Sequence, residues 1–189
     1  MLFICNGRYK QRPGEHMTNR EFFIKRWSAE TKITLKALAA LPQDMQTLEY
    51  RSHPKARSAH QIIGHILPFA ESLRISIATG ILDEPDLLFS SVPEAIQYVE
   101  KNSALLVEAL EKVTEEEWET RVVSLIINGR KIYDGTMMNM FWPLLFDTIH
   151  HRGQLSTYYR AMGVRNPGIY GPSAEDQEER AAAAAAQAG

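Results

Sequence analysis

Cysteine is almost absent from this chain, since Cys5 is the single cysteine among 189 residues. No disulfide can form within the chain, so a disulfide-stapled secreted scaffold is excluded. A single cysteine is typical of proteins that work in a reducing compartment. We therefore expect a cytoplasmic protein.

Long apolar runs are also missing. A helix that crosses a bilayer needs about 18 consecutive apolar residues, and no segment of the chain approaches that length. The apolar residues 2–5 that follow Met1 are too few for a signal-peptide core of about 7–15 residues. We expect neither a membrane span nor a secretory signal.

Charge of one sign is not in excess. The chain carries 21 Lys and Arg against 23 Asp and Glu, a formal net charge of −2. A nucleic-acid-binding protein needs a basic face or stripe, and none is visible, so we expect no nucleic-acid partner. The hydrophobic share of 44% and the charged share of 23% are ordinary for one globular domain of this length.

Helical periodicity dominates what is present. Apolar residues recur at steps of three and four in segments 19–41, 58–80, 91–113 and 136–162. This pattern predicts an all-α protein, an up-and-down four-helix bundle. Proline interrupts two of the helices. We expect Pro68 to bend the second one and Pro143 to break the last one near its start.

A small β-hairpin is predicted between the third and fourth helices. The β-prone runs 122–127 and 130–133 flank Asn128-Gly129, a pair that favours the tight turn of a two-stranded hairpin. The chain then divides into three parts: an aperiodic N-terminal extension (1–17), the bundle domain (18–173) and an Ala-rich flexible tail (174–189). Met17, at the end of the extension, is a candidate natural start.

Asp147 and His151 are the first candidates for chemistry. They are four residues apart, which places them on one face of the last helix, and they lie on its apolar stripe between Leu144 and Leu155. A carboxylate that faces a hydrophobic core needs a partner, and a cation is one. An ordinary hydrogen-bond network with histidine and Arg152 is the alternative, and the spacing alone leaves both open.

His65 is the third candidate. It belongs to the inward face of the second helix, together with Ile62 and Phe69. His60 is five residues earlier, about 140° away on the helix wheel, so only one of the two can face the bundle axis. The apolar neighbours favour His65. Two histidines and one carboxylate suit Zn²⁺, Fe²⁺ or Ni²⁺ and leave open coordination positions.

The chain resembles the DinB/YfiT-like family of metal-dependent proteins at three places. The segment IHHRGQL at residues 149–155 resembles the family's signature in the last helix, and Asp147 stands where many relatives carry histidine. Ser58 precedes His65 by seven residues, as a serine precedes the first family ligand. The segment IYGPS at residues 169–173 resembles the family's C-terminal segment.

The resemblance covers roughly residues 18–173 and implies a metal site formed by His65, Asp147 and His151. It also implies chemistry, because several characterised relatives use a low-molecular-weight thiol as co-substrate, such as bacillithiol, mycothiol or glutathione. We assign no catalytic group beyond the metal ligands. Three further residues are candidates for the surroundings of the ligands: Gln154, His150 and Tyr170. We expect Arg152 to pair with a carboxylate at the helix surface.

The expected function is that of a metal-dependent thiol S-transferase or hydrolase acting on a small-molecule substrate. The alternative is a non-catalytic helical bundle that the metal stabilises and that has a stress-related binding role. The sequence identifies neither the substrate nor the physiological metal. Whether the chain forms a homodimer is also left open.

Overall fold

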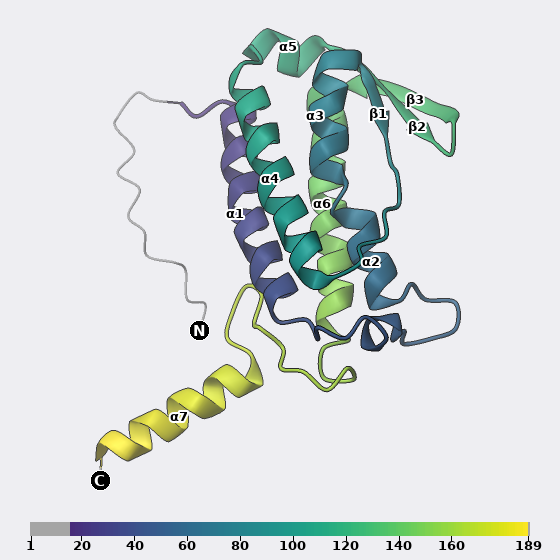
Figure 1. Cartoon of the computed structure of the whole chain (residues 1–189). Coiled ribbons are helices and arrows are strands. Elements are labelled where there is room, and N and C mark those ends of the chain that lie inside the picture. Colours follow the sequence, from purple (N-terminus) through teal and green to yellow (C-terminus); the bar gives the residue numbers. More distant parts are fainter. Residues whose placement is uncertain (1–15, 189) are drawn as a thin grey trace.

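A computed structural model describes residues 16–188 of the chain (Figure 1). The helices are α1 (Asn19–Ala39), the short 3-10 helix η1 (Thr47–Glu49), α2 (Ala59–Ile66), α3 (Phe69–Thr79), α4 (Val92–Glu111), α5 (Glu115–Thr120), α6 (Met137–Ser156) and α7 (Ala174–Ala188). The strands are β1 (Ile81–Asp83), β2 (Val122–Ile127) and β3 (Arg130–Thr136). Residues 1–15, which include Cys5 and most of the expected N-terminal extension, lie outside the described residues.

Short polar side chains define where the helices begin. The Thr18 hydroxyl accepts a hydrogen bond from the backbone N–H of Glu21, whose carboxylate accepts one in return from the Thr18 N–H. Ser58 and Gln61 form the same reciprocal pair at the start of α2, and Thr114 caps α5 in this way. These capping boxes satisfy backbone donors that have no partner inside a helix.

The second expected helix is divided at proline. The α2 helix ends at Ile66, and α3 begins after Pro68, which acts as its N-terminal cap. Proline has no N–H to donate and its ring clashes with the preceding turn, so the break agrees with the predicted bend. The α3 helix ends at Gly80, whose φ of 72° is the left-handed conformation that glycine adopts without cost.

The last long helix differs from its prediction. It ends at Ser156 rather than at Met162, and turns follow it. The hydroxyls of Ser156 and Thr157 donate to the carbonyls of Gly153 and Gln154, at 2.6 and 2.7 Å, and so compete with continuation of the helix. We also expected Pro143 to break this helix near its start, and that prediction is wrong, because α6 continues through it.

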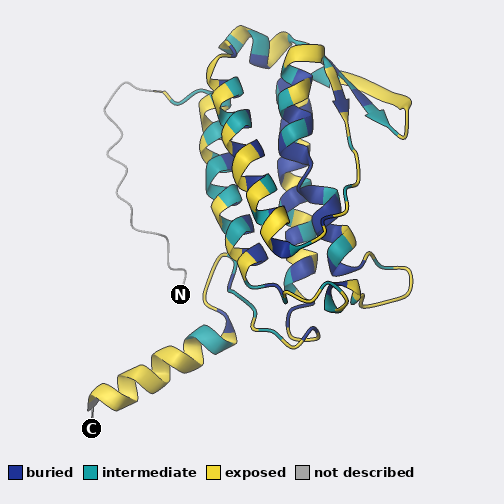
Figure 2. Cartoon of the chain, viewed as in Figure 1, coloured by how far each residue is buried: buried dark blue, intermediate teal, exposed yellow. Residues whose placement is uncertain are grey.

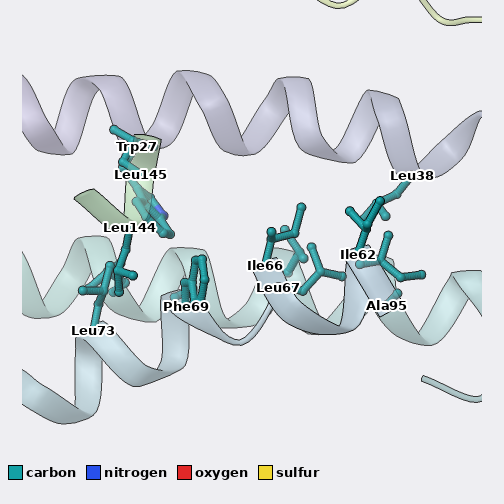
Figure 3. Close-up of a cluster of buried hydrophobic side chains, with 14 of the residues drawn as sticks. Trp27, Leu38, Ile62, Ile66, Leu67, Phe69, Leu73, Ala95, Leu144 and Leu145 are labelled. Atoms are coloured by element: carbon teal, nitrogen blue, oxygen red, sulfur yellow. The ribbon is translucent and has the colours of Figure 1, made fainter. Parts of the chain in front are cut away.

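The long helices share one hydrophobic core. The α1 helix packs against α4 and α6, α3 packs against the same two helices, and α2 packs against α6. Buried residues of all five helices meet in the interior, as the labelled side chains in Figure 3 show. Figure 2 shows the same pattern from outside, with buried positions on the inward faces of these helices. The fold is therefore mainly helical, and the contact between α2 and α6 brings two candidate ligand segments together.

The expected hairpin is present, but it belongs to a three-stranded sheet. Strands β2 and β3 pair antiparallel around a turn in which Asn128 and Gly129 have φ of 52° and 72°. Strand β1 pairs parallel with β2 at the other edge and was not predicted. With only three residues, β1 is too short to show an alternating pattern, and its pairing depends on where α3 ends.

The C-terminal segment forms the exposed helix α7, which extends away from the other helices (Figure 2). Ion pairs of Arg160 with Glu175, and of Arg165 with Asp176 and Glu179, attach its first turns to the preceding segment. The flexibility of this tail stays a prediction. Within residues 16–188, no helix combines the length and the apolar character that crossing a membrane requires.

Candidate metal centre

Three predicted ligands come together between two helices. His65 lies in the last turn of α2, while Asp147 and His151 lie one turn apart on α6. One ligand atom from each lies within 4.8 Å of the other two. The close packing of α2 against α6 joins a histidine to an aspartate that is 82 positions later in the chain.

The separations fit a shared cation. His65 Nε2 lies 3.4 Å from Asp147 Oδ2, and His151 Nε2 lies 3.5 Å from Asp147 Oδ1. Ligand atoms about 2.0–2.1 Å from a tetrahedral zinc ion lie about 3.3–3.4 Å from one another. The two imidazole rings stand nearly perpendicular, at 88°, with their centroids 5.0 Å apart. The nitrogen and oxygen donors of these side chains therefore fit a single divalent ion.

Hydrogen bonds on the outer side orient both imidazoles. His65 Nδ1 donates to Asp86 Oδ1 at 2.8 Å, and His151 Nδ1 donates to Gln154 Oε1 at 2.8 Å. The Gln154 amide nitrogen in turn donates to His150 Nε2 at 3.0 Å. With the proton on Nδ1, the Nε2 lone pair of each imidazole is available to a cation that Asp147 also binds. This arrangement is typical of metal-binding histidines.

Burial and charge shift the pKa of each group at the centre. The close contact with the Asp147 carboxylate raises the pKa of His65 above its ordinary value, and burial opposes this only in part. Burial lowers the pKa of His151, because desolvation disfavours the imidazolium. Burial alone would raise the pKa of Asp147, but the contact with His65 and the charge of His151 leave it lowered. Near neutral pH the centre therefore holds an ionised carboxylate and a neutral His151, as cation binding requires.

The loop after β1 supplies groups that the sequence reasoning missed. Asp86 contacts His65 directly, and Arg57 Nη1 lies 3.9 Å from Asp86 Oδ1. Burial raises the pKa of Glu84, and the charges of Asp147 and Asp86 add to that shift while His65 opposes it. The acidic composition of residues 83–86 is visible in the sequence. Only the folded chain shows that this loop lies beside His65.

His60, the residue weighed against His65, faces other partners. Its Nδ1 lies 3.0 Å from Glu49 Oε1, and its Nε2 lies 3.0 Å from the carbonyl of Phe89. Both ring nitrogens are thus engaged away from Asp147. His65, and not His60, lies beside Asp147, and its role as a ligand stays a prediction.

Arg152 and Tyr170, from the two C-terminal segments that resemble the family, lie in a different cluster. Arg152 was expected to pair with a carboxylate at the helix surface, but its side chain is 1% exposed and pairs with Glu30, itself 2% exposed, at 2.5 Å. The Tyr170 hydroxyl donates to Glu30 at 2.7 Å and accepts from Arg152 at 2.6 Å. Gln154 and His150 thus lie next to a candidate ligand. Tyr170 instead forms hydrogen bonds with Arg152 on α6 and with Glu30 on α1.

The chain is similar to known proteins of one family. The model of the DinB family matches residues 16–183. The uncharacterised protein YrdA of Bacillus subtilis is 25% identical over 160 residues, which cover 82% of this chain and 90% of YrdA.

Two solved structures share the fold. A DinB-like protein from Bacillus cereus matches with a TM-score of 0.63 and 24% identity, covering 79% of this chain and 97% of its own. The DinB-like protein YjoA of Bacillus subtilis matches with a TM-score of 0.60 and 18% identity, covering 80% of this chain and 99% of its own. At these identities the two structures establish a common fold.

Proposed function

The chain belongs to the DinB family, and we propose that it is a metal-dependent enzyme, a thiol S-transferase or a hydrolase. One observation carries the proposal: two imidazoles whose outer nitrogens are hydrogen-bonded present their inner nitrogens to the same carboxylate at 3.4 and 3.5 Å. His65, Asp147 and His151 would hold one divalent ion. We also propose that the fold is an up-and-down four-helix bundle. Its four members would be α1, the divided helix formed by α2 and α3, α4, and α6.

The types of donor atom limit which ions the site would bind and what chemistry they would supply. Two neutral imidazoles and one carboxylate suit Zn²⁺, and also Ni²⁺ or Fe²⁺. Three protein ligands leave coordination positions for a small molecule, which is typical of catalytic rather than structural sites. When bound, such an ion lowers the pKa of a coordinated thiol or water toward neutrality.

The residues of the chain contribute charge and orientation. The ionised Asp147 offsets part of the ion's charge, and the contacts of Gln154 and Asp86 hold the two imidazoles in place. The side chains of His65 and His151 are only 14% and 15% exposed, and that of Asp147 is 36% exposed, so access to the three candidate ligands is limited. A small-molecule substrate such as a low-molecular-weight thiol fits this access better than a macromolecule does.

Metal analysis tests the site. The purified wild-type protein, prepared without chelators and supplied with Zn²⁺, Ni²⁺ or Fe²⁺, is expected to retain about one ion per chain. His151→Ala and Asp147→Asn are expected to lose it. His53→Ala is the control, because His53 lies in the loop before α2, where its Nδ1 accepts from the backbone N–H of Lys55, and this variant should keep its metal. A wild-type protein that stays metal-free with all three ions contradicts the proposal.

Thiol binding separates an enzyme from a structural metal site. The loaded protein is expected to bind a low-molecular-weight thiol at the metal, visible with Co²⁺ or Ni²⁺ as a thiolate charge-transfer band. It is also expected to transfer that thiol to an electrophile or to hydrolyse a test ester. An ion that raises the melting temperature but exchanges neither thiol nor water favours the non-catalytic bundle instead.

A further inference from the structure

The connection from β1 to α4 runs beside α2 (Figure 1), and its residue Asp86 contacts the candidate ligand His65. We call residues 84–89 of this connection the strap. The backbone N–H of Leu87 donates to the carbonyl of Gly64 at 2.9 Å, and the carbonyl of Phe89 accepts from His60 Nε2 at 3.0 Å. Phe89 is buried at 4% exposure, so the end of the strap is anchored in the core. The strap is thus attached to α2 at two residues, Leu87 and Phe89, that follow Asp86 in the chain.

Gly64 allows this close approach. A Cβ atom built on Gly64 would lie 2.0 Å from the carbonyl oxygen of Leu87 and 3.2 Å from its carbonyl carbon. Both are backbone atoms, which cannot move aside as a flexible side chain can. Any residue other than glycine at this position would push the strap away from α2. Gly64 immediately precedes His65, so the closest approach occurs at the metal ligand itself.

The hydrogen bond between Leu87 and Gly64 places a carboxylate of the strap next to His65. Asp86 precedes Leu87 on the strap, His65 follows Gly64 on the helix, and Asp86 Oδ1 accepts from His65 Nδ1 at 2.8 Å. The Asp86 side chain is 69% exposed, and Arg57 Nη1 lies 3.9 Å from its Oδ1. The bond to His65 is therefore a directed polar contact on an otherwise solvated side chain, and the backbone of the strap sets its position.

We propose that Asp86 is a positioning residue for His65, and that the strap and Gly64 are parts of the metal centre. This inference rests on the proposed function. By accepting the Nδ1 proton, Asp86 selects the tautomer whose Nε2 lone pair faces Asp147. It also increases the electron density that His65 offers to a cation. Gln154 has the corresponding role for His151 from within α6, whereas Asp86 depends on the strap.

Metal affinity and imidazole tautomer test the role of Asp86 together. Asp86→Ala is expected to weaken Zn²⁺ binding about tenfold in competition with a chromophoric chelator, the lower end of the range for outer hydrogen-bond partners because Asp86 is solvated. In the metal-free protein, ¹⁵N NMR above the pKa of His65 should show the Nδ1–H tautomer in the wild type and a mixture in Asp86→Ala. Asp86→Asn keeps an acceptor oxygen and should recover most of the tautomer signal.

A matched control has the same chemistry elsewhere on α2. Glu49→Ala removes the carboxylate partner of His60, which is not a candidate ligand, but keeps the His60 imidazole that contacts Phe89 in the strap. This variant should therefore leave both Zn²⁺ affinity and the His65 tautomer unchanged. Gly64→Ala should weaken Zn²⁺ binding in the same direction as Asp86→Ala, because it displaces the strap.

The outcomes separate this inference from the function on which it rests. Wild-type affinity together with an unchanged His65 tautomer in Asp86→Ala would overturn the inference while leaving the metal centre intact. A wild-type protein that binds no metal refutes the proposed function. In that case the tautomer measurement alone decides whether Asp86 orients His65.

Discussion

Replacing Glu30 by alanine tests how the first and last long helices are held together. Glu30 on α1 and Arg152 on α6 form an ion pair at 2.5 Å in which the two side chains are 2% and 1% exposed. Arg152 also donates to the Glu30 carbonyl at 3.1 Å, to Thr34 Oγ1 at 3.0 Å and to the Tyr170 hydroxyl. Glu30→Ala removes the only carboxylate in this set and leaves the guanidinium charge buried.

The expected cost is large because burial prevents water from replacing the lost partner. Removing one member of a buried ion pair typically costs about 3–5 kcal/mol. For a domain of this size, 1 kcal/mol lowers the melting temperature by about 2–4 °C, so Glu30→Ala is expected to lower it by about 6–20 °C. The neutral contacts that Arg152 retains favour the lower half of that range.

Thermal and urea unfolding followed by circular dichroism measure this cost. Arg26→Ala is the control, because Arg26 contacts the same carboxylate at 2.8 Å but is 42% exposed. Its loss should cost no more than about 1 kcal/mol. Replacing both members, as Glu30→Ala with Arg152→Met, should recover part of the stability, since no unpaired charge then remains. If Glu30→Ala is no less stable than Arg26→Ala, the reasoning from burial is refuted.

Three further predictions concern acid stability, the hairpin turn and the metal. Burial alone would raise the pKa of Glu30, but its hydrogen bonds to Arg152 and Tyr170 leave that pKa below 4.5. The stabilisation by Glu30 is therefore present above pH 4.5 and disappears as acid titrates the folded carboxyl. The difference in stability between wild type and Glu30→Ala should shrink in urea titrations at lower pH, and a constant difference contradicts this prediction. Gly129→Ala, at a φ of 72°, should destabilise the fold by about 1–2 kcal/mol in the same assay, whereas a neutral result would show that the turn relaxes freely. Zn²⁺ at about 100 times its Kd should raise the melting temperature by about 5–11 °C near neutral pH, and much less at about pH 5.5, where protons occupy His65, whose pKa is raised by Asp147; an equal gain at both pH values would exclude histidine ligands.

Local features of this protein were predictable from sequence. Helix starts depend on a cap residue and its neighbour three positions later, as at Ser58, and the turn at Asn128-Gly129 depends on two residues that tolerate positive φ. The pairing of Asp147 with His151 is likewise set by one turn of helix. In each case the interacting atoms are so close along the chain that backbone geometry alone brings them together.

Competing local interactions limited even these predictions. The apolar period predicted a last helix to Met162, but hydroxyls at Ser156 and Thr157 bond the preceding carbonyls, and the helix ends there. Pro143, expected to break this helix, is accommodated within it. Periodicity describes which face is buried and does not measure the free energy of one further turn.

The sequence by itself thus determined the helical segments, the hairpin and, with the family motif, the identity of the three candidate ligands. Tertiary structure alone decided which groups surround them. Asp86 meets His65 because Gly64 lets the strap lie against α2, and Arg152 is buried because Glu30, 122 positions earlier, faces it from α1. Contacts between such distant residues depend on how whole elements pack, and no local pattern of residues encodes that packing.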